Sequence, residues 1–130
     1  MYRPARLLSV CRESGILFTR NQVLQQAGYT VVAAVEIQDA LAAMERERFD
    51  LVIIGHLYET AEKNLIATEA RRAGFKVLCM HSGLNPPDVD AATAFIHNLE
   101  RPERLLATIA ALVERAASAP VPDNRASNGP

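Results

Sequence analysis

Short hydrophobic runs alternate with longer segments of mixed polarity along most of this chain. Five of the runs are apolar almost throughout rather than at every second position, which is typical of strands buried on both faces of a sheet. The five predicted strands are residues 6–11, 30–34, 51–54, 77–80 and 95–97. Their regular recurrence indicates one continuous sheet rather than scattered strands.

The segments between the strands carry apolar residues at helical spacing. The predicted helices are residues 16–27, 36–48, 61–73 and 102–117. Gly28 and Gly74 follow the first and third of them, where glycine commonly ends a helix, and Pro102 suits a first helical turn. Residues 82–87 are predicted to be a loop, and the alanine-rich stretch 88–94 is expected to form one or two helical turns.

Strands that alternate with helices indicate a doubly wound α/β fold, in which a five-stranded parallel sheet has helices on both faces. We expect the flavodoxin-like strand order 2-1-3-4-5. In such sheets ligands and chemistry lie at the carboxyl ends of the strands, near the point where the strand order reverses. The residues at those ends are Cys11-Arg12-Glu13, Gly55-His56, His81-Ser82 and Asn98.

The length of 130 residues fits one domain, which we place at residues 1–117. Residues 118–130 consist mainly of Pro, Ser, Asn, Gly and Ala with hardly an apolar anchor. We expect them to be a disordered C-terminal tail, because such a composition buries too little apolar surface to order the chain.

Charge and cysteine content exclude several classes of protein. Fourteen Lys and Arg against fifteen Asp and Glu give a net charge of −1, which lacks the basic excess of a nucleic-acid-binding domain. No apolar run approaches the ~20 residues of a membrane span, and the charged pair Arg12-Glu13 interrupts any signal peptide. Cys11 and Cys79 lie in apolar runs, as expected of buried thiols in a reduced, cytoplasmic protein.

Four stretches of the sequence carry a more specific pattern. They are Arg6 to Glu13, Gly28-Tyr29-Thr30-Val31, Phe49 to Leu57 and residues 95–106. In this order and at these distances they resemble the receiver domain, the phosphoacceptor module of bacterial two-component response regulators. The resemblance covers about residues 5–117. It implies the receiver fold and a place in phosphorelay signal transduction, here expected as a stand-alone module.

At the positions that the resemblance matches to the functional residues of the family, this chain has residues of different chemistry. The two acidic residues that hold Mg²⁺ match Cys11 and Arg12, and the phosphoacceptor aspartate matches Gly55. The switch serine or threonine matches His81, and the lysine that contacts the phosphoryl group matches Asn98. A glycine cannot form an acyl phosphate, and these side chains offer no octahedral set of oxygen ligands. We therefore expect a degenerate receiver without metal, cofactor or enzymatic activity.

The same edge of the sheet is expected to form a pocket. Glu13, His56 and Ser82 are the further residues expected to line it, next to the five degenerate positions. The chain has only two lysines, Lys63 and Lys76, and the sequence places neither of them to substitute for the lysine of the family.

Three other chemistries at this edge are weaker hypotheses. Cys11, Glu13, His56 and His81 are of the metal-ligand type, but their spacing fits no recognised zinc pattern. A catalytic pair of Cys11 and a histidine has no supporting motif. His56 as an alternative phosphoacceptor lacks Mg²⁺ ligands. The favoured interpretation is that loop residues share an edge because the fold gathers all loops there.

Arg12 has two interpretations. Its guanidinium lies near the position of the family's metal ion, where it would pair with Glu13 or Glu59 and mimic a filled site. We favour the alternative, a solvated loop arginine, and we interpret Asn98 as a turn residue rather than as a cap for a neighbouring loop.

The segment between the fourth and fifth strands is shorter than in the family. Only fourteen positions lead from His81 to Phe95, and Pro86-Pro87 lies among them. Because proline is tolerated only in the first turn of a helix, we expect a shortened or irregular fourth helix and a changed dimerisation and output surface. The apolar stripe of the last helix is expected to be core, with a homodimer seam as the alternative: Leu105, Leu106, Ile109, Leu112 and Val113.

The leading functional hypothesis is a receiver-like signalling module that acts through protein–protein contacts. Its expected partner is a signalling protein such as a sensor kinase or regulator, with a homodimer as a second arrangement and no binding to nucleic acid or membrane. The alternative is a small-ligand or anion sensor that uses the vacated pocket at Cys11, Arg12, Gly55, His81 and Asn98. An enzyme that uses Cys11 and the histidines ranks last.

Overall fold

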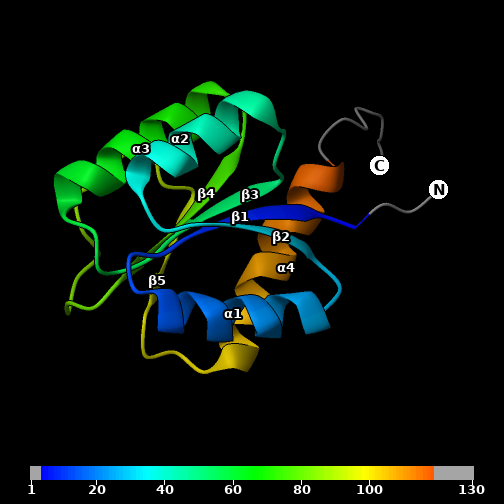
Figure 1. Cartoon of the computed structure of the whole chain (residues 1–130). Helices are drawn as coiled ribbons and strands as arrows, with labels where there is room; N and C mark the ends of the chain where they lie inside the picture. The colour runs from blue at the N-terminus through cyan, green and yellow to red at the C-terminus, as the bar shows by residue number, and fades with distance from the viewer. Residues whose placement is uncertain (1–3, 119–130) are drawn as a thin grey trace, which may run out of the picture.

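Figure 1 shows the computed structural model, which describes residues 4–118. Five parallel strands form one sheet in the order β2-β1-β3-β4-β5. The strands are β1 (Arg6–Val10), β2 (Thr30–Ala34), β3 (Leu51–Ile54), β4 (Lys76–His81) and β5 (Ala94–His97). The predicted sheet, its parallel strands and its order 2-1-3-4-5 are confirmed.

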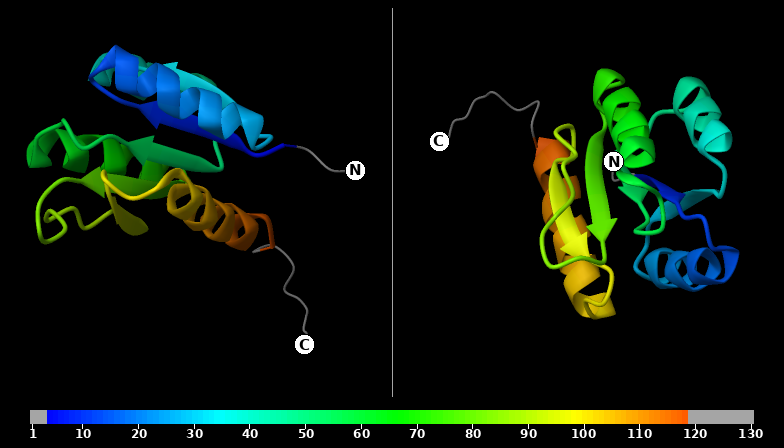
Figure 2. Two further views of the ribbon diagram at one scale, coloured as in Figure 1. Left: turned by 90° about the horizontal axis from the view of Figure 1, so that it is seen from below. Right: turned by 90° about the vertical axis from the view of Figure 1, so that its left-hand side faces the viewer.

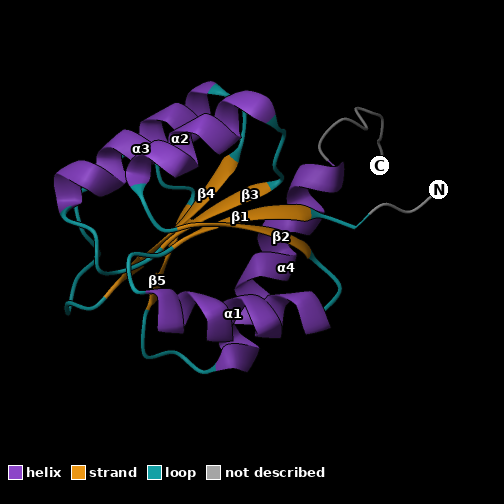
Figure 3. Ribbon diagram, in the orientation of Figure 1, coloured by secondary structure: helices purple, strands orange, loops and turns teal. Residues whose placement is uncertain are grey.

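Four helices of the described part of the chain cover the two faces of this sheet. They are α1 (Ser14–Gln26), α2 (Ile37–Arg46), α3 (Thr60–Arg72) and α4 (Pro102–Ser118). Figures 1 and 3 show α2 and α3 above the sheet and α1 and α4 below it, and the left view of Figure 2 looks onto the face that carries α1 and α4. Gly28 and Gly74 follow α1 and α3 with positive φ angles of 99° and 90°, as the predicted helix ends require.

The hydrophobic core consists of two clusters, one on each face of the sheet. Successive residues of β4 alternate between them: Val77 and Cys79 join the cluster under α2 and α3, whereas Leu78 and Met80 join the cluster under α1 and α4. This alternation follows from the strand, whose side chains point to opposite faces in turn. Both clusters contain residues of β1, β3 and β4, so the three central strands are buried on both faces.

The connection from β4 to β5 differs from the prediction. One or two helical turns are predicted for residues 88–94, but the segment 82–93 forms no helix. Two tight turns are closed within it, by Val89 N donating to Pro87 O at 2.9 Å and by Ala92 N donating to Val89 O at 3.2 Å. The buried Val89 holds the segment against the core. Thr93 Oγ1 accepts from Val77 N at 2.9 Å and so ties the end of the segment to β4. The fourth helix is therefore missing rather than shortened.

Other boundaries shift by one or two residues. β4 continues through His81, which the sequence places after the strand, and β1 ends at Val10 rather than Cys11. α4 continues to Ser118, so the proposed tail begins no earlier than residue 119. The rest of the predicted tail lies outside the described residues.

The apolar stripe of α4 packs into the core, as predicted. Leu105, Ile109 and Leu112 are buried, and Leu106 and Val113 are partly buried against the same cluster. The two cysteines are free and buried, which confirms the prediction for both thiols. No helix among residues 4–118 is long and apolar enough to cross a membrane.

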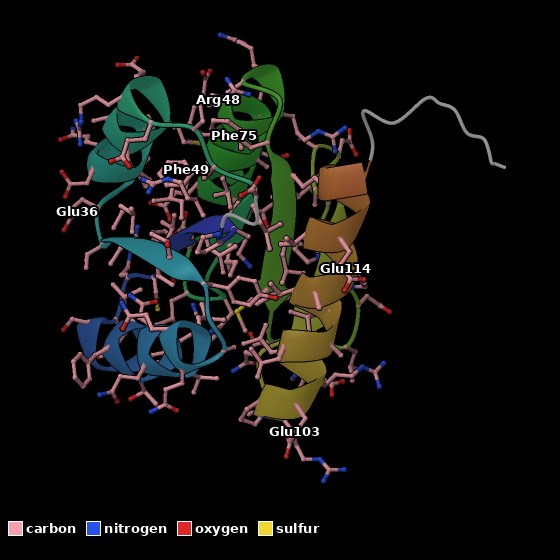
Figure 4. All side chains as sticks on the ribbon, turned by 90° about the vertical axis from the view of Figure 1, so that its right-hand side faces the viewer. Glu36, Arg48, Phe49, Phe75, Glu103 and Glu114 are labelled. Carbon is pink, nitrogen blue, oxygen red and sulfur yellow. The ribbon has the colours of Figure 1, made fainter. Side chains whose placement is uncertain are left out.

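Aromatic side chains close the amino edge of the sheet. Phe49, before β3, and Phe75, before β4, stack edge to face with ring centroids 5.8 Å apart. The guanidinium of Arg48 lies 5.5 Å from the centroid of the Phe75 ring, and Figure 4 shows Arg48, Phe49 and Phe75 close together at this end of the molecule. The opposite, carboxyl edge carries the loops with polar side chains.

Candidate functional site

The carboxyl edge of the sheet brings four of the predicted positions together. Backbone hydrogen bonds hold them: Gly55 N donates to Val10 O at 2.8 Å, and Cys11 N donates to Ala34 O at 3.0 Å. On the other side of the edge, Asn98 N donates to His81 O at 2.8 Å. Cys11, Gly55, His81 and Asn98 therefore occupy the ends of adjacent strands, as the sequence predicts.

Gly55 and Cys11 pack closely against each other. A Cβ atom on Gly55 would lie 3.1 Å from Val10 O and 3.4 Å from Cys11 Sγ. Both residues are buried, and Cys11 Sγ contacts Glu13 O at 3.5 Å. At the position to which the resemblance assigns the phosphoacceptor, the surroundings consist of a main-chain carbonyl and a thiol.

Arg12 is held by α3 and by an aromatic ring. Its Nη2 donates to Glu62 Oε2 at 2.7 Å, and its guanidinium lies 4.7 Å from the centroid of the Tyr58 ring. The alternative prediction of Glu13 or Glu59 as the partner is wrong, because the partner is Glu62. Glu13 instead caps α1, because its Oε1 accepts from Ile16 N at 2.8 Å. The favoured interpretation, a solvated loop arginine, agrees with the exposure of Arg12, and the ion pair with Glu62 is an addition to it.

Tyr58 forms the base of this contact. The residue is buried, and its hydroxyl donates to Val35 O at 2.5 Å. Desolvation raises the pKa of the Tyr58 phenol to about 12, so the phenol keeps its proton and the hydrogen bond across the physiological pH range. The loop after β3 is thereby fixed to the end of β2.

Glu62 links Arg12 to the start of α3. Its Oε1 accepts from Glu59 N at 2.9 Å, and this bond, followed by the bond from Arg12, lowers the pKa of the Glu62 carboxyl below its ordinary value of 4.5. A carboxyl with a lowered folded-state pKa stabilises the protein above its unfolded-state pKa, and this contribution is lost as the pH falls through the folded-state value.

We expect Glu62→Gln to lower stability at neutral pH and to make the unfolding free energy less sensitive to pH below 4.5. Urea unfolding at several pH values measures this slope. Glu69→Gln is the matched control, because Glu69 lies on the same helix and its carboxylate pairs with the exposed Arg72, at 3.4 Å. An identical acid slope for wild type and Glu62→Gln would contradict the role assigned to Glu62.

Two histidines meet at the ends of β4 and β5. The rings of His81 and His97 have centroids 5.3 Å apart. Leu99 N donates to His97 Nδ1 at 3.1 Å, so Nδ1 is the acceptor of the neutral ring and Nε2 carries the proton that is donated to Ser82 O at 3.2 Å. Ser82 thus contributes its main-chain carbonyl, and its side chain is exposed.

His56 lies at the same edge, in the loop between β3 and α3. Desolvation is the largest cause of a lowered pKa of its imidazole, and the positive charges of Arg20 and Lys63 lower it further. The Nδ1 atom of His56 is buried and has no hydrogen-bond partner within residues 4–118. His56 is therefore a neutral imidazole close to two cations.

Those two cations are functional candidates that the sequence analysis missed. Lys63 is 5% exposed, and its Nζ donates to Met80 O at 3.0 Å near the end of β4. Arg20 is 8% exposed on α1. A signal was present in the sequence: Arg20 lies three residues after Leu17 and four before Leu24, and Lys63 lies three before Ile66 and seven before Ala70. This spacing places each cation in the buried stripe of its helix.

The residues at this edge do not fit a magnesium ion, which the resemblance implies for an active receiver. Mg²⁺ requires several oxygen ligands in octahedral geometry. Cys11 presents a thiol, Arg12 a guanidinium and Gly55 no side chain. No group of three or more His, Cys, Asp or Glu that could hold a metal ion occurs in the part of the chain that the structure describes, so the soft metal site of Cys11, Glu13, His56 and His81 is not formed there.

Comparison with solved structures identifies the architecture. A receiver domain protein from Methanospirillum hungatei is 23% identical, with a TM-score of 0.77 over 90% of this chain and 99% of that chain. The chemotaxis protein CheY4 of Vibrio cholerae is also 23% identical, with a TM-score of 0.70 over 85% of this chain and 99% of that chain. This chain has the receiver fold.

No family model matches the sequence of the chain, and no curated protein matches it either. The similarity therefore rests on the fold. The fold itself is shared with proteins of several kinds. A structure described as an adenylate cyclase from Rhodopirellula baltica is 15% identical, with a TM-score of 0.78 over 91% of this chain and 93% of that chain. The signal receiver domain of a LuxO repressor protein from Vibrio parahaemolyticus is 16% identical, with a TM-score of 0.74 over 95% of this chain and 100% of that chain.

Proposed function

We propose that this chain is a signalling module of the receiver type that has lost phosphoryl transfer and acts through contacts with another protein. The observation that supports the proposal is the packing of Gly55, the residue that the resemblance assigns to the phosphoacceptor position, with Cys11 Sγ and Val10 O against it. An acyl phosphate needs a carboxylate, and the transferring phosphoryl group needs positive charge and Mg²⁺ around it. The proposed module has neither the acceptor nor the metal ligands, and we assign it no enzymatic activity.

The Arg12 contacts support the view that the loop after β3 keeps one conformation and does not switch between two. A receiver that carries Mg²⁺ brings positive charge to this edge only when the ion binds. Here the positive charge belongs to the chain, and it is held by Glu62 at 2.7 Å and by the Tyr58 ring at 4.7 Å. We propose that this internal cation keeps the loop after β3 in one conformation, so that the partner recognises a constant surface.

Incubation with acetyl phosphate and Mg²⁺ tests the loss of phosphoryl transfer. We expect no phosphoryl adduct in the intact mass, because no side chain exists at Gly55 to accept one. A response regulator that takes up phosphate under the same conditions is the positive control. A stable phosphoryl adduct on this chain would contradict the proposal.

The segment 82–93 is the proposed contact surface for a protein partner. It replaces the fourth helix, and its Leu84 side chain is fully exposed at 101%. Leu99, after β5, is 80% exposed. A signalling protein is the proposed partner and a homodimer the second arrangement. Light scattering distinguishes these two arrangements. A protein that stays monomeric at all concentrations would exclude the homodimer, and a different signalling protein would remain as the proposed partner.

A second candidate function is the sensing of a small anion in the vacated pocket. The specific observation in its favour is that Arg20 and Lys63 are both buried at this edge. Neither forms an ion pair with any acid of residues 4–118. A buried cation without a counter-ion is costly, so an anion at this edge would stabilise the fold.

A further inference from the structure

Arg20 carries a buried charge that the protein itself does not neutralise. Its Nη1 atom is buried and has no hydrogen-bond partner among the described residues. A guanidinium remains charged in proteins and cannot lose its proton to escape burial. The usual compensation is a carboxylate or another oxyanion in a charge-assisted hydrogen bond, and no carboxylate of residues 4–118 lies within ion-pair distance of Arg20.

Arg20 faces a groove. The groove lies between α1 and the β5–α4 connection, has a volume of about 530 Å³, and includes Met80, His97 and Asn98 in its wall. Its volume lies within the usual range of small-molecule sites. Asn98 Oδ1 is also buried without a partner in the described part of the chain. The side-chain amide can therefore turn its NH₂ group toward an acceptor in the groove.

Lys63 brings a second positive charge to the same place from the other face of the sheet. Its Nζ is bonded to Met80 O, and Met80 is part of the groove wall. The positive charges of Lys63 and Arg20 both lower the pKa of His56, so the two charges act on one edge. Their sum favours an anion that carries more than one negative charge.

Two carboxylates limit the size of that anion. Glu13 and Glu100 also line the groove, but both residues are exposed, and Glu13 Oε1 is engaged by Ile16 N at 2.8 Å. A long polyanion would pass these carboxylates and be repelled. A compact oxyanion at the Arg20 guanidinium would be exposed to less of this repulsion.

We propose that the groove between α1 and the β5–α4 connection binds a small oxyanion of the phosphate class, either inorganic phosphate or the phosphate group of a small monoester. Arg20 is the direct ligand, Asn98 provides a polar contact, and Lys63 adds charge without direct contact, whereas both ring nitrogens of His97 are engaged within the chain. The inference rests on the second candidate function, the sensing of an anion, and assigns its ligand chemistry. It also moves the site, because Asn98 and Glu13 are the only predicted pocket residues in the wall of this groove. Binding is reversible and involves no covalent step.

The test measures thermal unfolding and calorimetric binding of the full chain with inorganic phosphate, with glycerol phosphate and with sulfate, at an ionic strength held constant with chloride. A ligand that binds only the folded state raises the unfolding temperature in proportion to its affinity. We expect both phosphate compounds to stabilise wild type. A response to inorganic phosphate alone would identify the free ion, and a stronger response to glycerol phosphate would identify the monoester.

Variants locate the site. Arg20→Gln is expected to weaken phosphate binding at least about tenfold, because it removes a charge-assisted contact, and Arg20→Lys is expected to weaken it less. Lys63→Gln is expected to weaken it roughly threefold, since only a charge at longer range is lost. Arg72→Gln is the matched control, because the Arg72 side chain is 72% exposed on α3, and its binding should equal that of wild type.

A second readout distinguishes a ligand from a structural residue. Without phosphate, Arg20→Gln should be at least as stable as wild type, because it removes a buried charge without a counter-ion. If Arg20→Gln binds phosphate with the affinity of wild type, the proposed site is overturned, but the proposal that the protein senses an anion is not. No stabilisation of wild type by any of the three anions would overturn both, whereas the loss of phosphoryl transfer is judged separately by the intact mass after acetyl phosphate.

Discussion

Replacing Leu78 by alanine is expected to lower the free energy of unfolding by about 3.5 kcal/mol, the middle of the range for a buried leucine. Leu78 is fully buried in β4 and belongs to the cluster under α1 and α4. The surrounding strands cannot move to fill the space, because β4 is paired on both sides, with β3 and with β5. The variant therefore loses transfer free energy and leaves a cavity. Urea unfolding of wild type and variant measures the difference.

Leu84→Ala is the matched control, since the same atoms are removed from a side chain that is 101% exposed. Its expected effect is within about 0.5 kcal/mol, as for most surface substitutions. Equal losses in the two variants would show that Leu78 does not lie in a packed core, and this would contradict the assignment of β4 to the interior of the sheet.

The sheet was predictable because its strands are buried on both faces. Residues 51–54 and 77–80 read as unbroken apolar runs, and only a central strand between two helical layers requires apolar side chains on both sides. The ends of the strands were less predictable. His81 belongs to β4 although it is polar, since main-chain pairing with His97 of β5 continues one residue past the apolar run.

The connection between β4 and β5 was not predictable from local preference. The alanine-rich composition of residues 88–94 favours helical turns. The structure instead places Val89 in the core and uses the Thr93 side chain as an acceptor for Val77 N. These contacts are made with residues more than ten positions away, so tertiary packing decides the conformation and propensity does not.

The candidate site was predictable in position and only partly in chemistry. Parallel strands end at one edge, and this topology alone makes Cys11, Gly55 and Asn98 neighbours of that edge. The partners of long side chains depend on helices that approach from elsewhere. Arg12 reaches Glu62 rather than Glu59 because the first turn of α3 presents Glu62 to the loop after β1.

Lys63 shows why the charge distribution at this edge was missed. It is one of two lysines in the chain, and its distance in sequence from the fifth strand argues against a role at the carboxyl edge. Its position on the buried face of α3 nevertheless brings Nζ to Met80 O, near the carboxyl end of β4. A search for cations within apolar stripes, applied to α1 and α3, would have found both Arg20 and Lys63 from the sequence alone.

Placing an aspartate at position 55 is expected to destabilise the protein rather than restore a phosphoacceptor. In Gly55→Asp the new Cβ would lie 3.1 Å from Val10 O and 3.4 Å from Cys11 Sγ, closer than the packed backbone of β1 allows without movement. The carboxylate would enter a buried position beside a carbonyl oxygen, which repels it. We expect a loss of about 3 kcal/mol from overpacking and charge burial together, measured by urea unfolding.

Gly83→Asp is the matched control, because Gly83 is exposed and a Cβ there would meet only Asn85 O at an ordinary 3.6 Å. Its stability should stay close to that of wild type. Both variants are then treated with acetyl phosphate and Mg²⁺, and neither is expected to gain a phosphoryl adduct, because Cys11 and Arg12 supply no oxygen ligands for the ion. A stable Gly55→Asp variant that takes up phosphate would show that one aspartate is sufficient, and the proposed loss of phosphoryl transfer would then rest on Gly55 alone rather than on the whole edge.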